Sequence, residues 1–330
     1  MILTLTPAPA LDSTVRLPLL TPGETHRVDA ARVRAGGKGI NVARVLHAQG
    51  LPAHALATRG GANGAALAAD VAAAGIAASW VDVAAPTRSS TAWVEDSGRT
   101  TVLNERAAAL LPGEWDAWFA ALGALLPDAA AEARVVSGQH GVDGRHPGGG
   151  ARVATVSGSW PEGTPPAVVA RTVRTLVDAG VYTVADTSGP LLLTAAAAGA
   201  HLLKPNAQEL AEATGTDDIA AGLARLFELG AGSVLLSRGE DGMSHHTPED
   251  PGGLHARLDE VLVGNPTGAG DAGVAGWLAV AHRHGGIPGE GARREALRMA
   301  VAYSASAVLA PLAGELGPDV ASFPGRVLFA

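Results

Sequence analysis

Short β-prone runs alternate with helix-like segments along most of this chain. The predicted helices are residues 41–49, 65–74, 165–179, 207–214, 219–229, 269–284 and 292–309. Most of them are followed directly by glycine, the residue that most easily adopts the left-handed conformation at a helix end. The predicted strands include residues 135–136, 153–156, 181–184 and 234–236. Such alternation predicts an α/β fold with a mostly parallel sheet and helices on both faces.

Residues 91–103 follow a different pattern. Two β-prone runs, Thr91–Glu95 and Arg99–Leu103, flank the turn-forming sequence Asp96-Ser97-Gly98. This arrangement predicts a β-hairpin. Together with Ser13–Leu17, the hairpin is expected to form a small separate sheet inserted in the α/β body. A sheet of that kind often serves as a lid or as a dimerisation surface.

Composition excludes several classes of protein. Hydrophobic residues make up 47% of the chain, which is enough for a core and excludes global disorder. The net charge of −8 disfavours non-specific binding to nucleic acid or to anionic membranes. The absence of cysteine excludes disulfides and thiol catalysis. No apolar run approaches the ~20 residues of a membrane span, and the N-terminus lacks a basic signal region, so we expect a cytoplasmic location.

A glycine-rich stretch at about residues 138–150 shows no periodicity. We expect it to be a flexible insertion. His140 and His146 lie in it, but their spacing matches no metal-ligand motif, so a solvated loop is the favoured interpretation.

The most informative motif is Asn265–Asp271, which leads directly into an apolar helix. Gly268 and Gly270 would let backbone N–H groups face outward at the helix start, where a phosphate is favoured. Asp271 is either a base that accepts a proton from an attacking hydroxyl or a first-turn acid favoured by the helix dipole. These residues alone leave both interpretations open.

The same glycines, with Gly273, match the spacing of a dinucleotide-binding loop. The acidic residue expected about twenty positions later is absent, because Arg293 and Arg294 stand there. The motif also lies near the C-terminus, so a dehydrogenase is disfavoured.

Three further motifs precede or follow predicted strands and helices. The sequence from Gly36 to Asn41 is either the start of a helix that binds a ligand, with Lys38 reaching that ligand, or a glycine-rich helix start with no ligand. The sequence from Lys204 to Glu209 is either a capping box or a hard-oxygen pair, Asn206 and Glu209, for a hydrated Mg²⁺. Residues 237–242 follow a strand at the end where parallel sheets bind ligands.

Taken in order, these motifs resemble the PfkB, or ribokinase-like, family of carbohydrate kinases. The resemblance spans nearly the whole chain and extends to Thr4–Asp12, Ala35–Ala43, Ser157–Gly163 and Asp186–Gly189. It is strongest to the phosphosugar branch, which comprises 1-phosphofructokinase and tagatose-6-phosphate kinase. It implies a ribokinase-like three-layer α/β fold over residues 1–330, with a small β lid from about residues 12–27 and 86–106.

The resemblance also implies an activity. The γ-phosphoryl group of ATP would move to a phosphosugar hydroxyl, with fructose 1-phosphate as the first choice of acceptor. Tagatose-6-phosphate kinase, another sugar kinase of the family, and a non-catalytic sugar-phosphate sensor are the alternatives. A homodimer formed through the lid is also expected.

Residue roles follow from the same resemblance. Asp271 would be the base, and the N–H groups of Gly268, Ala269 and Gly270 would form the anion hole. Asn206 and Glu209 would hold Mg²⁺ through water. The predicted ATP-binding residues are Lys204, Ser237, Gly239, Gly242 and Thr267. The predicted sugar-binding residues are Asp12, Gly36, Gly37, Lys38, Asn41, Arg88, Asn104 and Arg106.

Two of these cations, Lys38 and Arg88, are expected to meet the phosphate that the substrate already carries. Arg106 is a weaker candidate for the same role. The chain departs from the family pattern at Ala8, where Asn is usual, at Ser90 in the lid, and at Trp160, where Leu is usual. These departures bear on which sugar is bound rather than on phosphoryl transfer.

Overall fold

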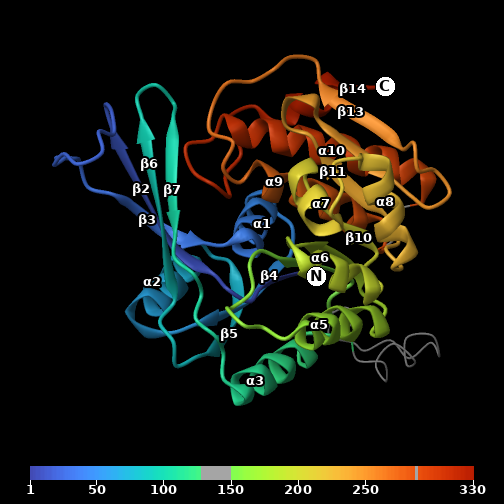
Figure 1. Cartoon of the computed structure of the whole chain (residues 1–330), viewed down its shortest axis with the longest axis horizontal. Coiled ribbons are helices and arrows are strands. Elements are labelled where there is room, and N and C mark those ends of the chain that lie inside the picture. Colours follow the sequence, from blue (N-terminus) through green and yellow to red (C-terminus); the bar gives the residue numbers. More distant parts are fainter. Residues whose placement is uncertain (128–149, 287–288) are drawn as a thin grey trace, which may run out of the picture.

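A ten-stranded sheet forms the centre of the molecule in the computed structural model, which describes residues 1–127, 150–286 and 289–330 (Figure 1). The strand order is β14-β13-β12-β11-β10-β9-β8-β1-β4-β5. The bounds are β1 Ile2–Thr6, β4 Ala53–Arg59, β5 Ala77–Asp82, β8 Val153–Ser157, β9 Tyr182–Asp186, β10 Leu202–Leu203, β11 Val234–Ser237, β12 Met243–His246, β13 Leu254–Leu258 and β14 Val327–Phe329. Strands β11 to β5 in this order pair in parallel, and β12, β13 and β14 pair antiparallel.

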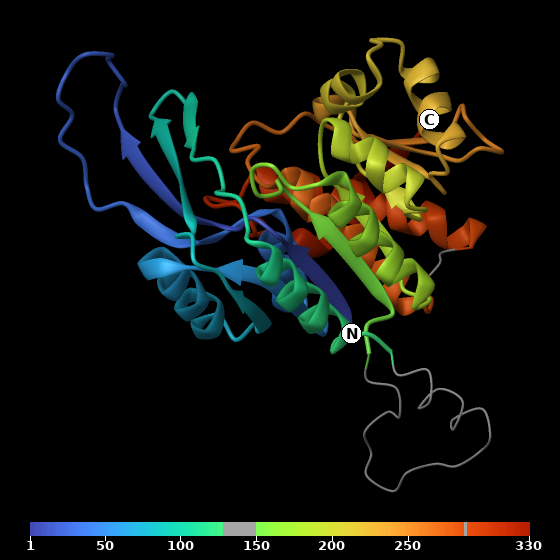
Figure 2. The ribbon, with the colours of Figure 1, turned by 60° about the horizontal axis from the view of Figure 1, so that its bottom comes forward.

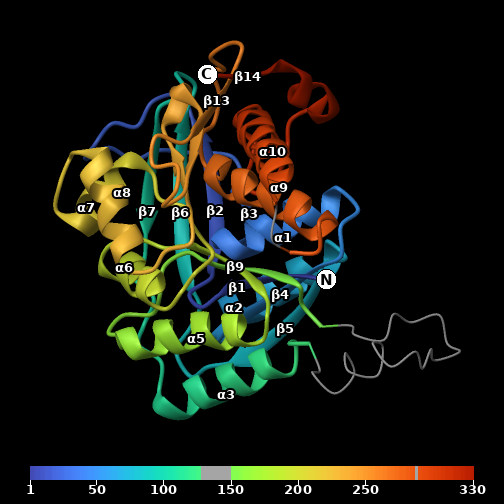
Figure 3. The ribbon, with the colours of Figure 1, turned by 90° about the vertical axis from the view of Figure 1, so that its right-hand side faces the viewer.

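Helices cover both faces of this sheet. They are α1 Lys38–Ala48, α2 Gly61–Ala73, α3 Pro112–Gly123, α5 Pro166–Asp178, α6 Pro190–Ala197, α7 Ala207–Thr214, α8 Ile219–Glu228, α9 Ala269–Arg283 and α10 Glu290–Val308. Figure 3 shows α9 and α10 on one side of the strands and α6, α7 and α8 on the other. The predicted three-layer α/β fold with a mostly parallel sheet is therefore confirmed.

Side chains on β1 show how the sheet separates two cores. Ile2 packs with buried residues of α1, α2, α9 and α10. Leu3 and Leu5 point the other way and pack with α3 and α5. A third cluster joins α5, α6, α7 and α8 on that same face. Because alternate residues of a strand face opposite sides, β1 is buried on both faces, and Thr4 and Thr6 are buried along with its apolar residues.

A second, four-stranded sheet projects from the body (Figure 2). Its order is β3-β2-β6-β7, with bounds β3 Arg32–Gly36, β2 Ala10–Leu17, β6 Arg88–Glu95 and β7 Thr100–Asn104. The predicted small sheet and its hairpin are present. Strand β3 was not predicted, because its sequence runs from exposed residues into the glycine motif.

The register gives each face of this sheet a distinct character. Arg34, Asp12, Ser90 and Asn104 are partners across the four strands and so lie in one row on one face. The neighbouring row on the opposite face, Val33, Ser13, Thr91 and Leu103, exposes two apolar side chains. Of these two neighbouring rows, one is therefore polar and the other partly apolar.

Two predictions fall outside the described residues. These are the strand at residues 135–136 and the flexible insertion, all of which but Gly150 lies in residues 128–149. Within the described parts of the chain, none of the helices has the length and hydropathy needed to span a bilayer.

Candidate active site

A cavity of about 1310 Å³ lies where the small sheet meets the carboxyl ends of the parallel strands. The small sheet contributes Asp12, Arg88, Ser90 and Asn104 to its walls. Its other walls include the starts of α1 and α9, the ends of β9, β10 and β11, residues 258–264 and part of α10. The cavity thus brings together segments that are far apart in sequence, at the edge where open α/β sheets bind ligands.

Asp271 lies in the first turn of α9 and is 5% exposed. Its Oδ2 accepts a hydrogen bond of 2.8 Å from Nδ2 of Asn41. Burial raises the pKa of Asp271 to about 7, although Lys38, Asn41 and Lys204 act in the opposite direction. A carboxyl group that titrates near neutrality suits a general base, because it is ionised at neutral pH and still binds a proton well.

The start of α9 presents backbone donors to the cavity. Gly268 is the N-cap residue, with φ of 85°, a conformation that glycine adopts without strain. Gly268, Ala269 and Gly270 all line the cavity. Nζ of Lys204 lies 3.4 Å from the position that a Cβ on Gly270 would occupy. The backbone N–H of Ala269 donates to the carbonyl of Pro266 at 3.1 Å. A cation beside backbone N–H groups at a helix N-terminus gives a site for phosphate oxygens.

Asp186, at the end of β9, joins two lysines of the cavity. Its Oδ1 lies 2.9 Å from Nζ of Lys38 and 3.5 Å from Nζ of Lys204. Burial alone would raise the pKa of Asp186, but the two lysines outweigh burial and hold the pKa below its ordinary value. The carboxylate is therefore ionised and fixes both cations.

Sequence reasoning did not place Asp186 in the site. The available signal was its position at the carboxyl end of a buried strand, followed by Thr187-Ser188-Gly189. Lys38 also lies 3.6 Å from Oε1 of Glu209, and these carboxylates keep its pKa raised in spite of burial. Lys38 thus lies among the acidic residues near Asp271.

Asn206 and Glu209 form the capping box of α7. Oδ1 of Asn206 accepts from the backbone N–H of Glu209 at 2.8 Å, and Oε2 of Glu209 accepts from that of Asn206 at 2.9 Å. The capping interpretation is therefore confirmed. Oε1 of Glu209 lies beside the cavity, 3.6 Å from Nζ of Lys38, and the buried Oδ2 of Asp186 has no hydrogen-bond partner. These hard oxygen donors fit Mg²⁺ bound partly through water.

The small sheet holds Asp12 and Arg88 at the other end of the cavity. Burial raises the pKa of Asp12 to about 6, against the charges of Arg88 and Arg34. Gly36 is the cross-strand neighbour whose missing side chain leaves room for the Asp12 carboxylate, so it supports this residue without lining the cavity. Arg88 donates from Nε and Nη2 to the carbonyl of Ala8, and from Nη1 to that of Glu105.

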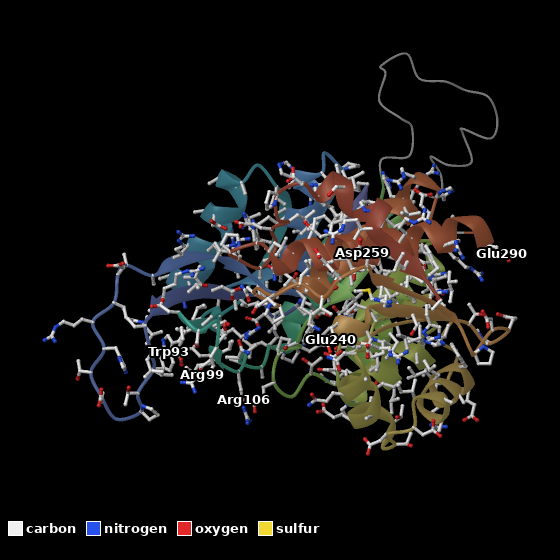
Figure 4. All side chains as sticks on the ribbon, turned by 90° about the horizontal axis from the view of Figure 1, so that it is seen from above. Trp93, Arg99, Arg106, Glu240, Asp259 and Glu290 are labelled. Atoms are coloured by element: carbon white, nitrogen blue, oxygen red, sulfur yellow. The ribbon has the colours of Figure 1, made fainter. Side chains whose placement is uncertain are left out.

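Three predicted sugar-binding residues have other partners. Asn41 donates a hydrogen bond to Asp271, so its side chain lies beside the proposed catalytic base. Oδ1 of Asn104 accepts from Oγ of Ser90 at 2.7 Å. Arg106 has a side chain that is 87% exposed and lies 3.5 Å from Oε1 of Glu162 (Figure 4). All three line the cavity, and their contacts with substrate stay predictions.

The predicted ATP-binding residues form another wall of the cavity. Ser237 ends β11, and its backbone N–H donates to the carbonyl of Pro205. Gly239 and Gly242 bound a short turn with φ of 61° and 82°. Thr267 precedes Gly268 and bonds through its N–H to Oδ1 of Asn265. Each of these four residues lines the cavity, as does the predicted sugar-contacting Gly37.

Comparison with known proteins shows which family the chain resembles. The model of the pfkB family carbohydrate kinases matches residues 8–122 and 149–319. The 1-phosphofructokinase of Haloferax volcanii is 33% identical over 327 residues, covering 97% of this chain and 94% of that protein. The 1-phosphofructokinase of Rhodobacter capsulatus is 30% identical over 326 residues, covering 94% and 90%.

A solved structure shares the fold. Phosphofructokinase-2 from Escherichia coli, in complex with fructose-6-phosphate, matches with a TM-score of 0.77 and 25% identity over 98% of both chains. The family match covers the four-stranded sheet, all strands of the ten-stranded sheet except β1 and β14, and the start of α9, where Asp271 lies. The chain therefore belongs to the pfkB family of carbohydrate kinases and is a phosphotransferase that uses ATP.

Proposed function

We propose that this kinase phosphorylates fructose 1-phosphate to fructose 1,6-bisphosphate with ATP and Mg²⁺. The observation that carries the proposal is a buried carboxylate with a pKa of about 7 beside the donors at the start of α9. Relatives at 33% and 30% identity, both named 1-phosphofructokinase, support the choice of acceptor.

The chemistry is an in-line transfer to a primary hydroxyl. The hydroxyl oxygen forms a bond to the γ-phosphorus as the bond to the β,γ-bridging oxygen breaks, and ADP leaves. Asp271 accepts the proton of the attacking hydroxyl. The N–H groups of Gly268, Ala269 and Gly270, with Lys204 beside them, stabilise charge on the transferring oxygens.

Glu209 and Asp186 would hold Mg²⁺, with Asn206 orienting Glu209 through the capping box. Bound there, the ion would neutralise charge on the phosphates of ATP. Lys204, which Asp186 holds in place, serves the same negative charge from the protein side. Asp12 would hold the sugar, and Arg88 its phosphate, from the small sheet acting as a lid.

The acceptor can be identified by measuring ATP consumption with fructose 1-phosphate, fructose 6-phosphate, tagatose 6-phosphate and the free sugars. We expect the highest kcat/KM with fructose 1-phosphate. Preference for another phosphosugar would replace the acceptor but keep the phosphosugar class, and preference for a free sugar would reject that class.

The phosphate contact is tested by Lys38→Ala and Arg88→Ala. Arg88→Ala should raise KM for phosphosugars by at least tenfold more than KM for their free counterparts. Lys38→Ala should do so as well, and should also lower kcat because Lys38 borders the base. Arg16→Ala, at an exposed position on the same sheet, is the matched control. Equal effects on phosphorylated and free sugars would reject the phosphate contact.

A homodimer through the outer face of the small sheet is part of the proposal. Val33 and Leu103 are about half exposed in one row of that face, and Trp93 and Val15 pair beside them (Figure 4). Large exposed apolar side chains on one sheet face favour association. Light scattering should give twice the chain mass, and Leu103→Glu should give monomers. A monomeric wild type would reject the dimer.

A further inference from the structure

Arg34 connects the small sheet to a turn that follows α10. Its Nη1 donates a hydrogen bond of 2.6 Å to Oε1 of Glu315, and its Nη2 donates to the carbonyl of Ala313. The Arg34 side chain is only 12% exposed, although it comes from an edge strand. A shielded arginine that bonds a carboxylate and a carbonyl holds both in fixed positions.

The turn held in this way packs on the start of α9. A Cβ added to Gly268 would lie 2.8 Å from Cβ of Ala313 and 2.9 Å from its Cα. The backbone of Ala313 therefore lies directly against the N-cap of the helix that carries Asp271. Any outward movement of Ala313 would free Gly268 to move as well, because this close contact is what confines it.

The same turn touches the partner of the base. A Cβ on Gly314 would lie 3.1 Å from Nη2 of Arg34 and 3.1 Å from Oδ1 of Asn41. Asn41 in turn donates to Asp271. The turn at residues 313–315 is thus enclosed by Arg34, Asn41 and Gly268, and two of these belong to the catalytic end of the cavity.

Arg34 also lies in the same row of the small sheet as Asp12, the residue proposed to hold the sugar. It is the cross-strand partner of Asp12, and its charge opposes the burial that raises the pKa of Asp12. The Arg34 side chain therefore contacts the turn that packs on Gly268, and it also lies beside the Asp12 carboxylate, which is proposed to bind the sugar.

We propose that Arg34 is a positioning residue, which fixes residues 313–315 against Gly268 and Asn41 and so aligns the anion hole and the base with the small sheet. This inference rests on the roles proposed above for Gly268 and Asp271. Arg34 touches neither the phosphoryl group nor the base, so its effect on the reaction is exerted through Ala313 and Gly314.

Arg34→Met tests the inference, because it removes both hydrogen bonds and keeps an apolar side chain of similar length. We expect kcat to fall about 30-fold, part of the loss seen when one anion-hole donor is removed, with KM for ATP within threefold of wild type. Arg34→Lys should recover part of kcat, since it can reach one of the two partners. Arg32→Met, at an exposed position on the same strand, should leave kcat unchanged.

Amide hydrogen exchange provides the second readout. Residues 309–317 should exchange at least tenfold faster in Arg34→Met and at the wild-type rate in Arg32→Met. A kcat within twofold of wild type, or faster exchange spread over the whole chain, would overturn the proposal. If Arg34→Met does not fold, Glu315→Ala decides, with a fall in kcat of about tenfold expected and an unchanged kcat contradicting it.

The acceptor in these assays is the sugar phosphate that the wild type uses fastest. If the wild type phosphorylates no acceptor of the panel, the proposed function fails. The exchange rates of residues 309–317 would still show whether Arg34 holds the turn.

Discussion

Asn41 donates a hydrogen bond of 2.8 Å to Asp271, and this bond joins the first turns of α1 and α9. Both side chains are buried, and Oδ1 of Asn41 has no hydrogen-bond partner. Burial disfavours the charged form of Asp271, while the amide donor favours it. The two residues together set the pH at which Asp271 can accept a proton.

Replacing the base should separate binding from chemistry. We expect Asp271→Asn to lower kcat about 10³-fold, because the amide cannot accept the proton of the hydroxyl. The Kd for ATP should stay within threefold of wild type, since the donors of Gly268 and Lys204 remain. Steady-state kinetics and calorimetric titration measure the two quantities, with Asp82→Asn as an exposed control. Substantial residual turnover would contradict the base assignment.

The pH dependence of kcat/KM should report Asp271. Its pKa is about 7 and the base acts only when ionised, so the rate should fall tenfold per pH unit below that value. Asn41→Ala removes a donor that lowers the pKa, so the midpoint should move to higher pH. A rate profile from pH 5 to 9 measures both midpoints. Identical midpoints in the two proteins would show that another group controls the rate.

Asp186 should matter for stability as well as for the site. Asp186→Asn leaves Lys38 and Lys204 without the carboxylate that they share, and we expect unfolding to become easier by about 3 kcal/mol. The pKa of Asp186 is lower in the folded state than in the unfolded state, so this stabilisation exists above its unfolded pKa and is lost in acid.

Urea unfolding at pH 7 and pH 3 would measure this effect. The difference between wild type and Asp186→Asn should be smaller at pH 3 than at pH 7. Asp82→Asn removes an exposed ion pair with Arg59 and should hardly move the midpoint at either pH. Equal destabilisation by the two substitutions would contradict the shared role of Asp186.

Gly268→Ala should damage catalysis through a specific clash. The added Cβ would lie 2.8 Å from Cβ of Ala313, so the helix start or the turn must move. We expect kcat to fall about 100-fold. Gly199→Ala is the matched control, because Gly199 has nearly the same φ, 83°, with open space around it. Comparable losses of kcat in the two variants would rule out the clash as the cause.

Local signals predicted much of the fold. The segment Ala207–Thr214 is a helix with the predicted bounds, because Asn206 caps its start and Gly215 ends it in the left-handed conformation. Helix α6, Pro190–Ala197, was missed because its residues are apolar all round and give no amphipathic period. Strand β3 was missed because its pairing with β2 comes from tertiary contacts.

The candidate site was predictable only in part for a similar reason. Motifs indicated Asp271, Lys38 and Lys204, since each stands beside glycine or proline at a helix or strand end. The contact of Asp186 with both lysines depends on β9 lying between β8 and β10, which no local pattern encodes. Arg34 and Ala313 likewise meet through long-range packing, far apart in the chain.

The position of β1 in the sheet has a consequence for folding. This strand precedes both of its partners in the chain and pairs with β4 on one side and with β8 on the other. Its second edge therefore stays open until residues 153–157 have been synthesised. Because parallel pairing over such separations is slow, Ile2–Thr6 presents an apolar strand edge to other chains during synthesis. Variants in which β8 pairs more slowly with β1 should therefore aggregate, even where the folded protein keeps its activity.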